Sequence, residues 1–269
     1  MKPFLVLLRW NLRWERARLA ALALAAGIFL GLLVGLSDVI RPAEMQEFSA
    51  KLPPAFQSMA NLKIGQEFTP DSWIAIAHSH PLWLVLVLTF PLHFGVAAFA
   101  RRIEDGSLET ILAEPISRTT YYLSAAASLA AGTLAVVAVS TAGGLIGSRL
   151  VHLPSTIPPG RFLAHAASGA SLALAVGGIA LAASATLGGR GRPRAWTLGA
   201  VVVFFFVEYL SRIWSRFAWA GRLSLFHYHA PHQIARDGLA IWNVAVLLGT
   251  ALLSCALGLV AFRRRALSF

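Results

Sequence analysis

The stretch EDGSLETILAEPISR, Glu104 to Arg118, holds four of the 12 acidic residues of this 269-residue chain, although the chain as a whole carries a net charge of +11. Two long apolar runs flank it, residues 80–100 before it and residues 123–147 after it. Each run is long enough to cross a hydrocarbon layer about 30 Å thick. The acidic stretch is therefore predicted to be a loop between two membrane spans.

The stretch itself is predicted to form a short helix. Asp105 is a suitable N-cap residue. Leu108, Ile111 and Leu112 share one helical face through their i, i+3 and i+4 spacing. Pro115 ends the helix at or near the residue before it. We expect a cytoplasmic helix with an apolar strip, acidic flanks and defined ends.

Composition extends this interpretation to the whole chain. Only 13% of the residues are charged, about half the share of a soluble domain, and the mean hydropathy is +0.66. The sequence predicts an all-α integral membrane protein, with one transmembrane domain over residues 1–269. Two runs rich in small residues, within 132–144 and 169–178, allow close helix packing inside one subunit or between subunits. Six spans are expected, at about residues 19–36, 80–100, 123–147, 162–187, 195–213 and 240–262.

The N-terminal segment, residues 3–17, alternates basic residues with apolar or aromatic ones. Trp10 and Trp14 stand among Arg9 and Arg13. This pattern is typical of an amphipathic helix that lies in the membrane interface. A cleavable signal peptide is not expected, because the apolar stretch is short and is broken by a basic residue.

The distribution of basic residues predicts the orientation. Six spans place both termini on one side, and 14 of the 23 Lys and Arg residues fall in short segments on that side. The positive-inside rule then predicts a multi-pass protein of the cell membrane with both termini in the cytoplasm. Basic residues at the ends of apolar runs also meet anionic membrane lipid, so no nucleic-acid partner is expected.

The acidic stretch would then lie in a cytoplasmic loop, where positive charge is the norm. One interpretation is a solvated loop helix resting on the membrane surface. Acidic side chains fit that interpretation poorly because the leaflet is itself negative. A docking surface for a cytoplasmic partner explains the charge and the apolar strip together, and the sequence favours it.

The segment RRIEDGSLETILAEPISRTTYYLSAAAS, Arg101 to Ser128, resembles the loop between the second and third spans of ABC-2 type transporter permeases. Members of that family carry an acidic residue, Gly-Thr or Gly-Ser, Leu-Glu, a few apolar residues and Pro-Ile-Ser-Arg before the next span. Ser107 stands where Thr is frequent, which is a mild departure. The rest of the chain fits the family more loosely, through its amphipathic N-terminus, six spans and basic C-terminus.

The resemblance implies that the loop is a coupling helix, which rests in a groove of an ATP-binding cassette ATPase subunit and passes its movements to the spans. It further implies a permease dimer, formed with a second copy or a paralogue, and two ATPase subunits. The residues that it assigns to ATPase docking are Glu104, Asp105, Gly106, Ser107, Leu108, Glu109, Leu112 and Pro115.

The chain has no nucleotide site of its own. A phosphate-binding P-loop needs Gly-Lys followed by Ser or Thr, and the three lysines are followed by Pro3, Leu52 and Ile64. The chain is therefore not expected to be an enzyme or to hold a cofactor. ATP and Mg would bind to the partner subunit.

Glu208 is the one acidic residue inside a predicted span. An acid within the membrane marks a functional site by default. Arg212 lies four residues later on the same helical face and can pair with it. Both interpretations stay open, a structural ion pair and a role in the translocation pathway.

Histidines gather in the regions predicted to lie at or beyond the outer boundary of the membrane. His227, His229 and His232 form the densest group, and histidine is the commonest ligand of zinc and copper. Their spacing matches no regular metal motif, and the neighbouring aromatic residues suit a membrane-interface belt. No metal is expected, and these three residues remain the candidates.

Two other classes of function stay open. A secondary transporter or channel that works without ATP would need ionisable residues deep in several spans, and the six spans show no obvious inverted repeat. An intramembrane enzyme or an assembly factor would need a nucleophile–base pair or a metal-ligand set at one depth. The transported substrate is not encoded in any motif.

Overall fold

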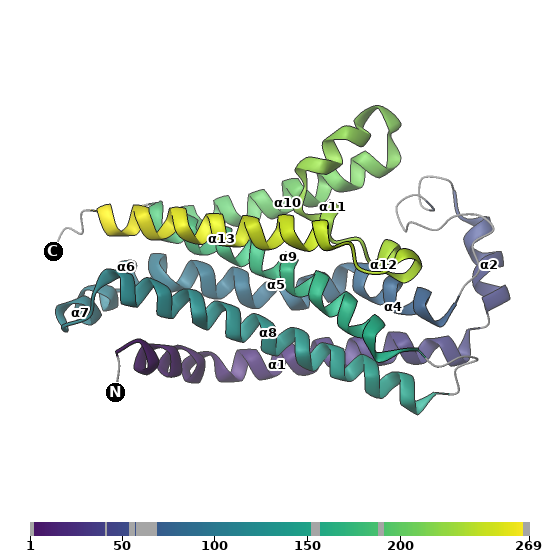
Figure 1. The fold of residues 1–269 in the computed structure, drawn as a ribbon, viewed down its shortest axis with the longest axis horizontal. Helices are drawn as coiled ribbons and strands as arrows, with labels where there is room; N and C mark the ends of the chain where they lie inside the picture. Colours follow the sequence, from purple (N-terminus) through teal and green to yellow (C-terminus); the bar gives the residue numbers. More distant parts are fainter. Residues whose placement is uncertain are drawn as a thin grey trace.

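Six long apolar helices form the body of the molecule (Figure 1). The computed structural model describes residues 3–40, 42–53, 57, 69–151, 157–187 and 191–265. No strand occurs within these ranges, so the predicted all-α membrane class is confirmed. In chain order the elements are α1 (Pro3–Val39), α2 (Pro42–Lys51), α4 (Pro70–Ser79), α5 (Pro81–Val96), the π-helix η1 (Ala97–Arg101), α6 (Arg102–Glu104), α7 (Ser107–Ala113), α8 (Arg118–Leu150), α9 (Pro159–Thr186), α10 (Arg192–Ile213), the 3₁₀ helix η2 (Ser215–Leu223), α11 (Leu225–Tyr228), α12 (Pro231–Asp237) and α13 (Ile241–Arg264).

The two ends of the bundle differ. The start of α1, the α6–α7 loop and the end of α13 lie at one end, which we call the terminal end (Figure 1). Helices α2, α4 and α12 lie at the opposite end, which we call the distal end. The acidic loop therefore lies on the same side as the start of α1 and the end of α13, as six spans require.

One predicted boundary is absent. We expected an interfacial helix over residues 3–17 and a separate span from residue 19, whereas α1 runs unbroken from Pro3 to Val39. The junction, ERARLAALA, contains no glycine or proline, and its residues are strong helix formers. Nothing in the local sequence breaks the helix, so the basic segment extends the first span.

Helix α1 packs along α8 through small residues. A Cβ atom added at Gly31 would lie only 2.8 Å from the carbonyl oxygen of Gly143. The same crossing also holds Gly27 and Gly147, so that backbone meets backbone over two turns. Close approach of this kind provides the van der Waals contact that holds helices together in lipid. The small-residue run in α8 thus serves packing inside one subunit.

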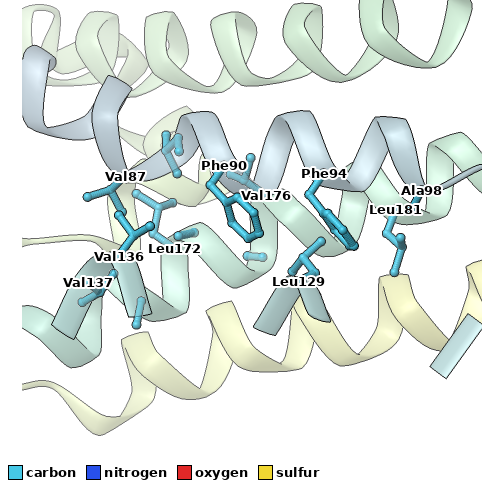
Figure 2. Close-up of a cluster of buried hydrophobic side chains, with 14 of the residues drawn as sticks. Val87, Phe90, Phe94, Ala98, Leu129, Val136, Val137, Leu172, Val176 and Leu181 are labelled. Carbon is cyan, nitrogen blue, oxygen red and sulfur yellow. The ribbon is translucent and has the colours of Figure 1, made fainter. Parts of the chain in front are cut away.

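The core lies between α5, α8 and α9, and its side chains interlock (Figure 2). Phe90 and Phe94 of α5 stack on each other, with ring centroids 5.6 Å apart. Helix α9 is the most buried of the six spans, whereas α10 and α13 are the most exposed. The labelled core residues are Val87, Phe90, Phe94, Ala98, Leu129, Val136, Val137, Leu172, Val176 and Leu181 (Figure 2).

Candidate functional site: the acidic loop and the polar groups inside the bundle

The acidic loop has the predicted helix, with a different cap. Gly106 has a φ of 73° and occupies the N-cap position of α7, because glycine adopts this left-handed conformation without steric cost. Asp105, expected at the cap, stands one residue earlier, where its Oδ1 accepts hydrogen bonds from the backbone nitrogen and hydroxyl of Ser107 at 3.0 and 2.6 Å. These bonds lower the pKa of the Asp105 carboxyl, with added help from Arg101 and Arg102. The helix ends before Glu114, as Pro115 predicts.

The apolar strip of α7 faces inward. Leu108 is 0% exposed and belongs to the main core of the molecule. Ile111 and Leu112 are half-buried and pack against that core. Leu108, which the resemblance assigns to docking, thus lies in the core of the chain itself, whereas Ile111 and Leu112 keep part of their surface exposed. The strip stabilises the end of the bundle, because the helix buries most of its apolar side there.

The acidic side of the loop faces outward. Glu104, Asp105, Glu109 and Glu114 are all exposed, as is Pro115. The loop therefore offers a negatively charged surface with an apolar anchor beneath it. Gly106 and Ser107, also assigned to docking by the sequence, are half-buried at the start of α7.

Hydrogen bonds fasten this loop region to the ends of several spans. Arg118, at the start of α8, donates to the carbonyl oxygen of Arg265 at 2.6 Å, just beyond the end of α13. Arg265 in turn donates to the carbonyl oxygen of Ala185 in α9 at 3.0 Å. Glu104 accepts from the backbone nitrogen of Gly191, at the start of α10, at 3.3 Å. A displacement of the loop would thus bear directly on α8, α9, α10 and α13.

Arg102 links the loop to α1. Its guanidinium donates to Tyr121 Oη at 2.6 Å and to Asn11 Oδ1 at 2.8 Å, and it lies over the ring of Trp10 at 4.7 Å. Asn11 Nδ2 donates to Ser128 Oγ at 3.0 Å. This network sets a buried polar side chain of α1 against α8. The amphipathic pattern of residues 3–17 predicted a helix in the membrane interface and gave no sign of this network.

A buried carboxylate was also missed. Glu15 is 7% exposed and pairs with Arg18, one turn later. His93 Nε2, from α5, lies 3.8 Å from Glu15 Oε1. Leu7, Asn11 and Glu15 are spaced by four residues and share the buried face of α1. That spacing was readable from the sequence as a polar-containing inward face.

Glu208 and Arg212 make the expected contact inside α10. Arg212 Nε donates to Glu208 Oε1 at 2.8 Å, and Glu208 is 7% exposed. The structure adds a third group, since His227 Nδ1 lies 3.3 Å from Glu208 Oε2. The His227 ring thus lies beside the second carboxylate oxygen, which accepts no hydrogen bond from the described residues.

A cavity of about 400 Å³ adjoins this cluster at the distal end. Its walls are mostly apolar and come from α2, α4, α5, α10, α11 and α12. The charged and titratable side chains of its lining are Glu208, Arg212, His80, Tyr209, His229 and His232. An apolar cavity with a few convergent polar groups is the usual form of a small-molecule site.

The three candidate metal ligands are not brought together. His227 faces Glu208, whereas His229 is buried against Ser168, with 2.9 Å between Nδ1 and Oγ. His232 is buried in α12. Within the described residues, no three His, Cys, Asp or Glu side chains form a group that could hold a metal ion.

The buried histidines pack as aromatic rings instead. The rings of His78 and His165 stack with centroids 4.9 Å apart, and His229 stacks on Trp83 at 5.8 Å. Burial lowers the pKa of His78 to about 3 and the pKa values of His229 and His232 to about 4. These rings are neutral at neutral pH and hold α4 and α12 against α9.

Comparison with known proteins gives one family. The model of the family described as "Multidrug efflux system permease Rv1217c, C-terminal domain" matches residues 10–263. The match covers all six long helices from within α1 almost to the end of α13. A comparison with curated proteins found no match.

Proposed function

Because this chain belongs to the family of the multidrug efflux system permease Rv1217c C-terminal domain, we propose that it is the membrane-spanning subunit of an exporter of the ABC-2 type. In this proposal a separate ATP-binding cassette subunit binds to the acidic loop and drives transport. The chain forms the translocation pathway together with a second permease copy or a paralogue. The efflux family supports the permease role, and the loop supports the coupling role.

The acidic outer face of α7 is the observation that carries the ATPase partnership. Exposed Glu109 and Glu114 cover a helix whose apolar side is anchored in the core. The bonds of Arg118, Glu104 and Arg102 connect this region to four of the long helices, α1, α8, α10 and α13. A partner that pulls on this surface would therefore move the spans as a group, because the helix cannot slide without breaking these contacts.

ATP and Mg belong to the partner in this proposal. The sequence lacks the Gly-Lys-Ser/Thr element that cradles nucleotide phosphates. The present chain then supplies no hydrolytic chemistry of its own. Its task is to convert the partner's movement into opening and closing of the pathway.

The exposed spans support a second permease unit. Helices α10 and α13 carry rows of exposed apolar side chains, and α10 contributes four residues to the lining of the distal cavity. A second six-helix unit facing α10 would close this cavity and share it. In the protein for which the family is named, the matched unit is a C-terminal domain, which agrees with a unit that works beside others.

Reversal of charge on α7 tests the partnership. We expect Glu109→Lys with Glu114→Lys to insert and fold normally, since both side chains are exposed and surface changes usually cost less than about 0.5 kcal/mol. The variant should lose the ATPase subunit in co-purification and lose ATP-dependent transport in vesicles. Like charges across an interface disfavour association by several kcal/mol.

A matched control carries the same charge change elsewhere. Asp38→Lys with Asp237→Lys alters two exposed acids in the last turns of α1 and α12, and should keep both ATPase binding and transport. Retention of the ATPase by the α7 variant, or its equal loss from the control, would contradict docking on the loop.

Proton-coupled transport is a second candidate function, and the buried Glu15–His93 pair favours it. This pair adds ionisable groups at a second depth of the bundle, beside those of Glu208. Transport by vesicles that contain this chain alone, driven by a pH gradient without ATP, would support it. A strict requirement for ATP and the ATPase subunit would exclude it.

A further inference from the structure

A second cavity, of about 570 Å³, lies at the terminal end of the bundle between α5, η1 and α10. Its volume falls within the range of pockets that hold small ligands. The cavity is distinct from the distal one and shares none of its lining residues. Neither the efflux family nor the loop proposal assigns it a ligand.

Positive charge predominates in its lining. Arg101 and Arg194 both line it, one from η1 and one from α10. Across the described part of the chain, neither guanidinium takes part in a salt bridge. Glu104 is the one acid in the lining, and its carboxylate already accepts the backbone nitrogen of Gly191. His93 completes the polar wall on the side of Glu15.

The backbone is specially shaped at this point. Ser184 of α9 inserts its hydroxyl into α5–η1, where it accepts from Ala100 N at 2.8 Å and donates to Val96 O at 2.6 Å. These two groups would bond to each other in a regular α-helix. The inserted hydroxyl satisfies both groups where the helix widens into the π-turn that lines the cavity. Such π-turns are frequent at functional sites.

Most of the remaining lining is apolar, apart from Thr89 and Thr197. It includes Leu92 and Val96 of α5 and Leu198 of α10, and Leu198 is exposed on α10. Beyond it, α10 presents the exposed apolar side chains of Val202 and Phe206. A ligand with an anionic head in the cavity could therefore extend an apolar chain along the outer face of α10.

We propose that this cavity binds the phosphate head group of an anionic amphiphile, with Arg101 and Arg194 as its two cationic ligands. Guanidinium groups bind phosphate through paired, charge-assisted hydrogen bonds. Basic pockets between membrane helices at the cytoplasmic side are established sites of this kind for phospholipid heads. The inference concerns binding alone, so it stands or falls independently of the ATPase partnership.

The test compares lipid binding to the purified full chain in phosphatidylcholine nanodiscs. Spin-labelled phosphatidylglycerol should show a motionally restricted population on the wild-type protein that exceeds that of spin-labelled phosphatidylcholine. Arg101→Gln with Arg194→Gln should weaken this preference about thirtyfold, the size expected for two lost arginine contacts. Thermal unfolding of the variant should match the wild type, because both side chains are exposed.

Arg192→Gln with Arg264→Gln is the matched control. It removes the same charge from two exposed residues at the same end that do not line the cavity, and it should keep the preference. Competition by water-soluble glycerol phosphate would assign the site to a free phosphate ester, whereas failure to compete assigns it to lipid. An unchanged preference in the Arg101–Arg194 variant, or an equal loss in the control, would overturn the proposal.

Discussion

Glu208 and Glu15 are buried carboxylates whose negative charges are compensated by different neighbours. Glu208 is held by Arg212 of its own helix and by His227 of α11. Glu15 has Arg18 beside it and His93 on a different helix. An ion pair within one helix can form whatever the positions of the other spans. A contact between α1 and α5 forms only when these two helices are packed against each other. The two carboxylates therefore call for different tests.

Removal of both members of the Glu208–Arg212 pair is expected to preserve folding and transport. A single change, Glu208→Gln, leaves the arginine charge without its partner in an apolar site and should cost about 3 to 5 kcal/mol. The double variant, Glu208→Gln with Arg212→Met, should recover most of that loss. The check is thermal unfolding in detergent together with transport. A double variant that folds but does not transport would show that the pair belongs to the pathway.

Leu108 distinguishes the anchoring role of α7 from its docking role. Leu108→Ala removes a fully buried side chain and should lower the free energy of unfolding by about 2 to 5 kcal/mol. Leu112→Ala, in the same helix but half-buried, should cost clearly less. Detergent unfolding curves measure both. If Leu108→Ala leaves stability unchanged and only abolishes ATPase binding, the apolar strip faces a partner after all.

At the scale of elements, short helices at the distal end are held by neutral histidines. His229 of the α11–α12 segment lies 3.2 Å through its Nε2 from the carbonyl oxygen of His78 in α4. His165 of α9 stacks on His78 and is fully buried, and neither of its ring nitrogens has a hydrogen-bond partner among the described residues. Arg161 of α9 also pairs with Asp71 of α4, at 3.3 Å. Packing of α4 and α12 on α9 thus combines uncharged histidine rings with the polar contacts of Arg161.

Acidification is expected to loosen this packing. Because the pKa values of His78, His229 and His232 are lower in the folded chain than the ordinary 6.5, the unfolded chain binds more protons. Their contribution is complete above pH 6.5. It is lost as pH falls toward about 4 for His229 and His232 and toward about 3 for His78, at about 1.4 kcal/mol per histidine and pH unit. Arg212 and Arg236 add to the cost of charging His232.

Unfolding curves recorded across this pH range measure the effect. His232→Gln should make the decline of stability with falling pH shallower, because about one proton fewer is taken up on unfolding. If the slope of stability against pH is unchanged in this variant, the pKa of His232 does not differ between the folded and the unfolded chain.

At the scale of the molecule, the proposed orientation places the terminal end in the cytoplasm. The start of α1, the acidic loop and the end of α13 gather at that end (Figure 1), and most basic residues of the sequence fall in its segments. Docking, lipid binding and energy coupling all depend on this orientation. Ser58 and Ser268, which lie in segments expected on opposite sides of the membrane, are outside the described residues.

Cysteine labelling tests the orientation with described positions. In a Cys255→Ala background, a cysteine at exposed Thr110 should resist an impermeant thiol reagent in intact cells, and one at exposed Ser215 should react. Both should react after the membrane is permeabilised. Labelling of the Thr110 position from outside would reverse the orientation and remove the basis for docking.

The features that could be predicted from the sequence are those that depend on neighbouring residues in the chain. The lengths of the apolar runs predicted the six spans, and Pro115 predicted the end of α7. The i, i+4 spacing predicted the contact between Glu208 and Arg212. Each depends on residues within a few turns of one another. Burial of Leu108 could not be predicted this way, because an apolar strip on a short helix reads the same whether it faces a partner or its own bundle.

The contacts between polar groups of different helices could be identified only from the folded structure. Asn11, Arg102 and Tyr121 are far apart in the chain and form one network, and Ser184 shapes a π-turn in a different helix. In a bilayer the lipid is as apolar as the helix surfaces, so hydrophobicity gives the number of spans but not their neighbours. Close backbone packing at sites such as Gly31 and Gly143 sets the neighbours, and these in turn bring the distant polar groups together.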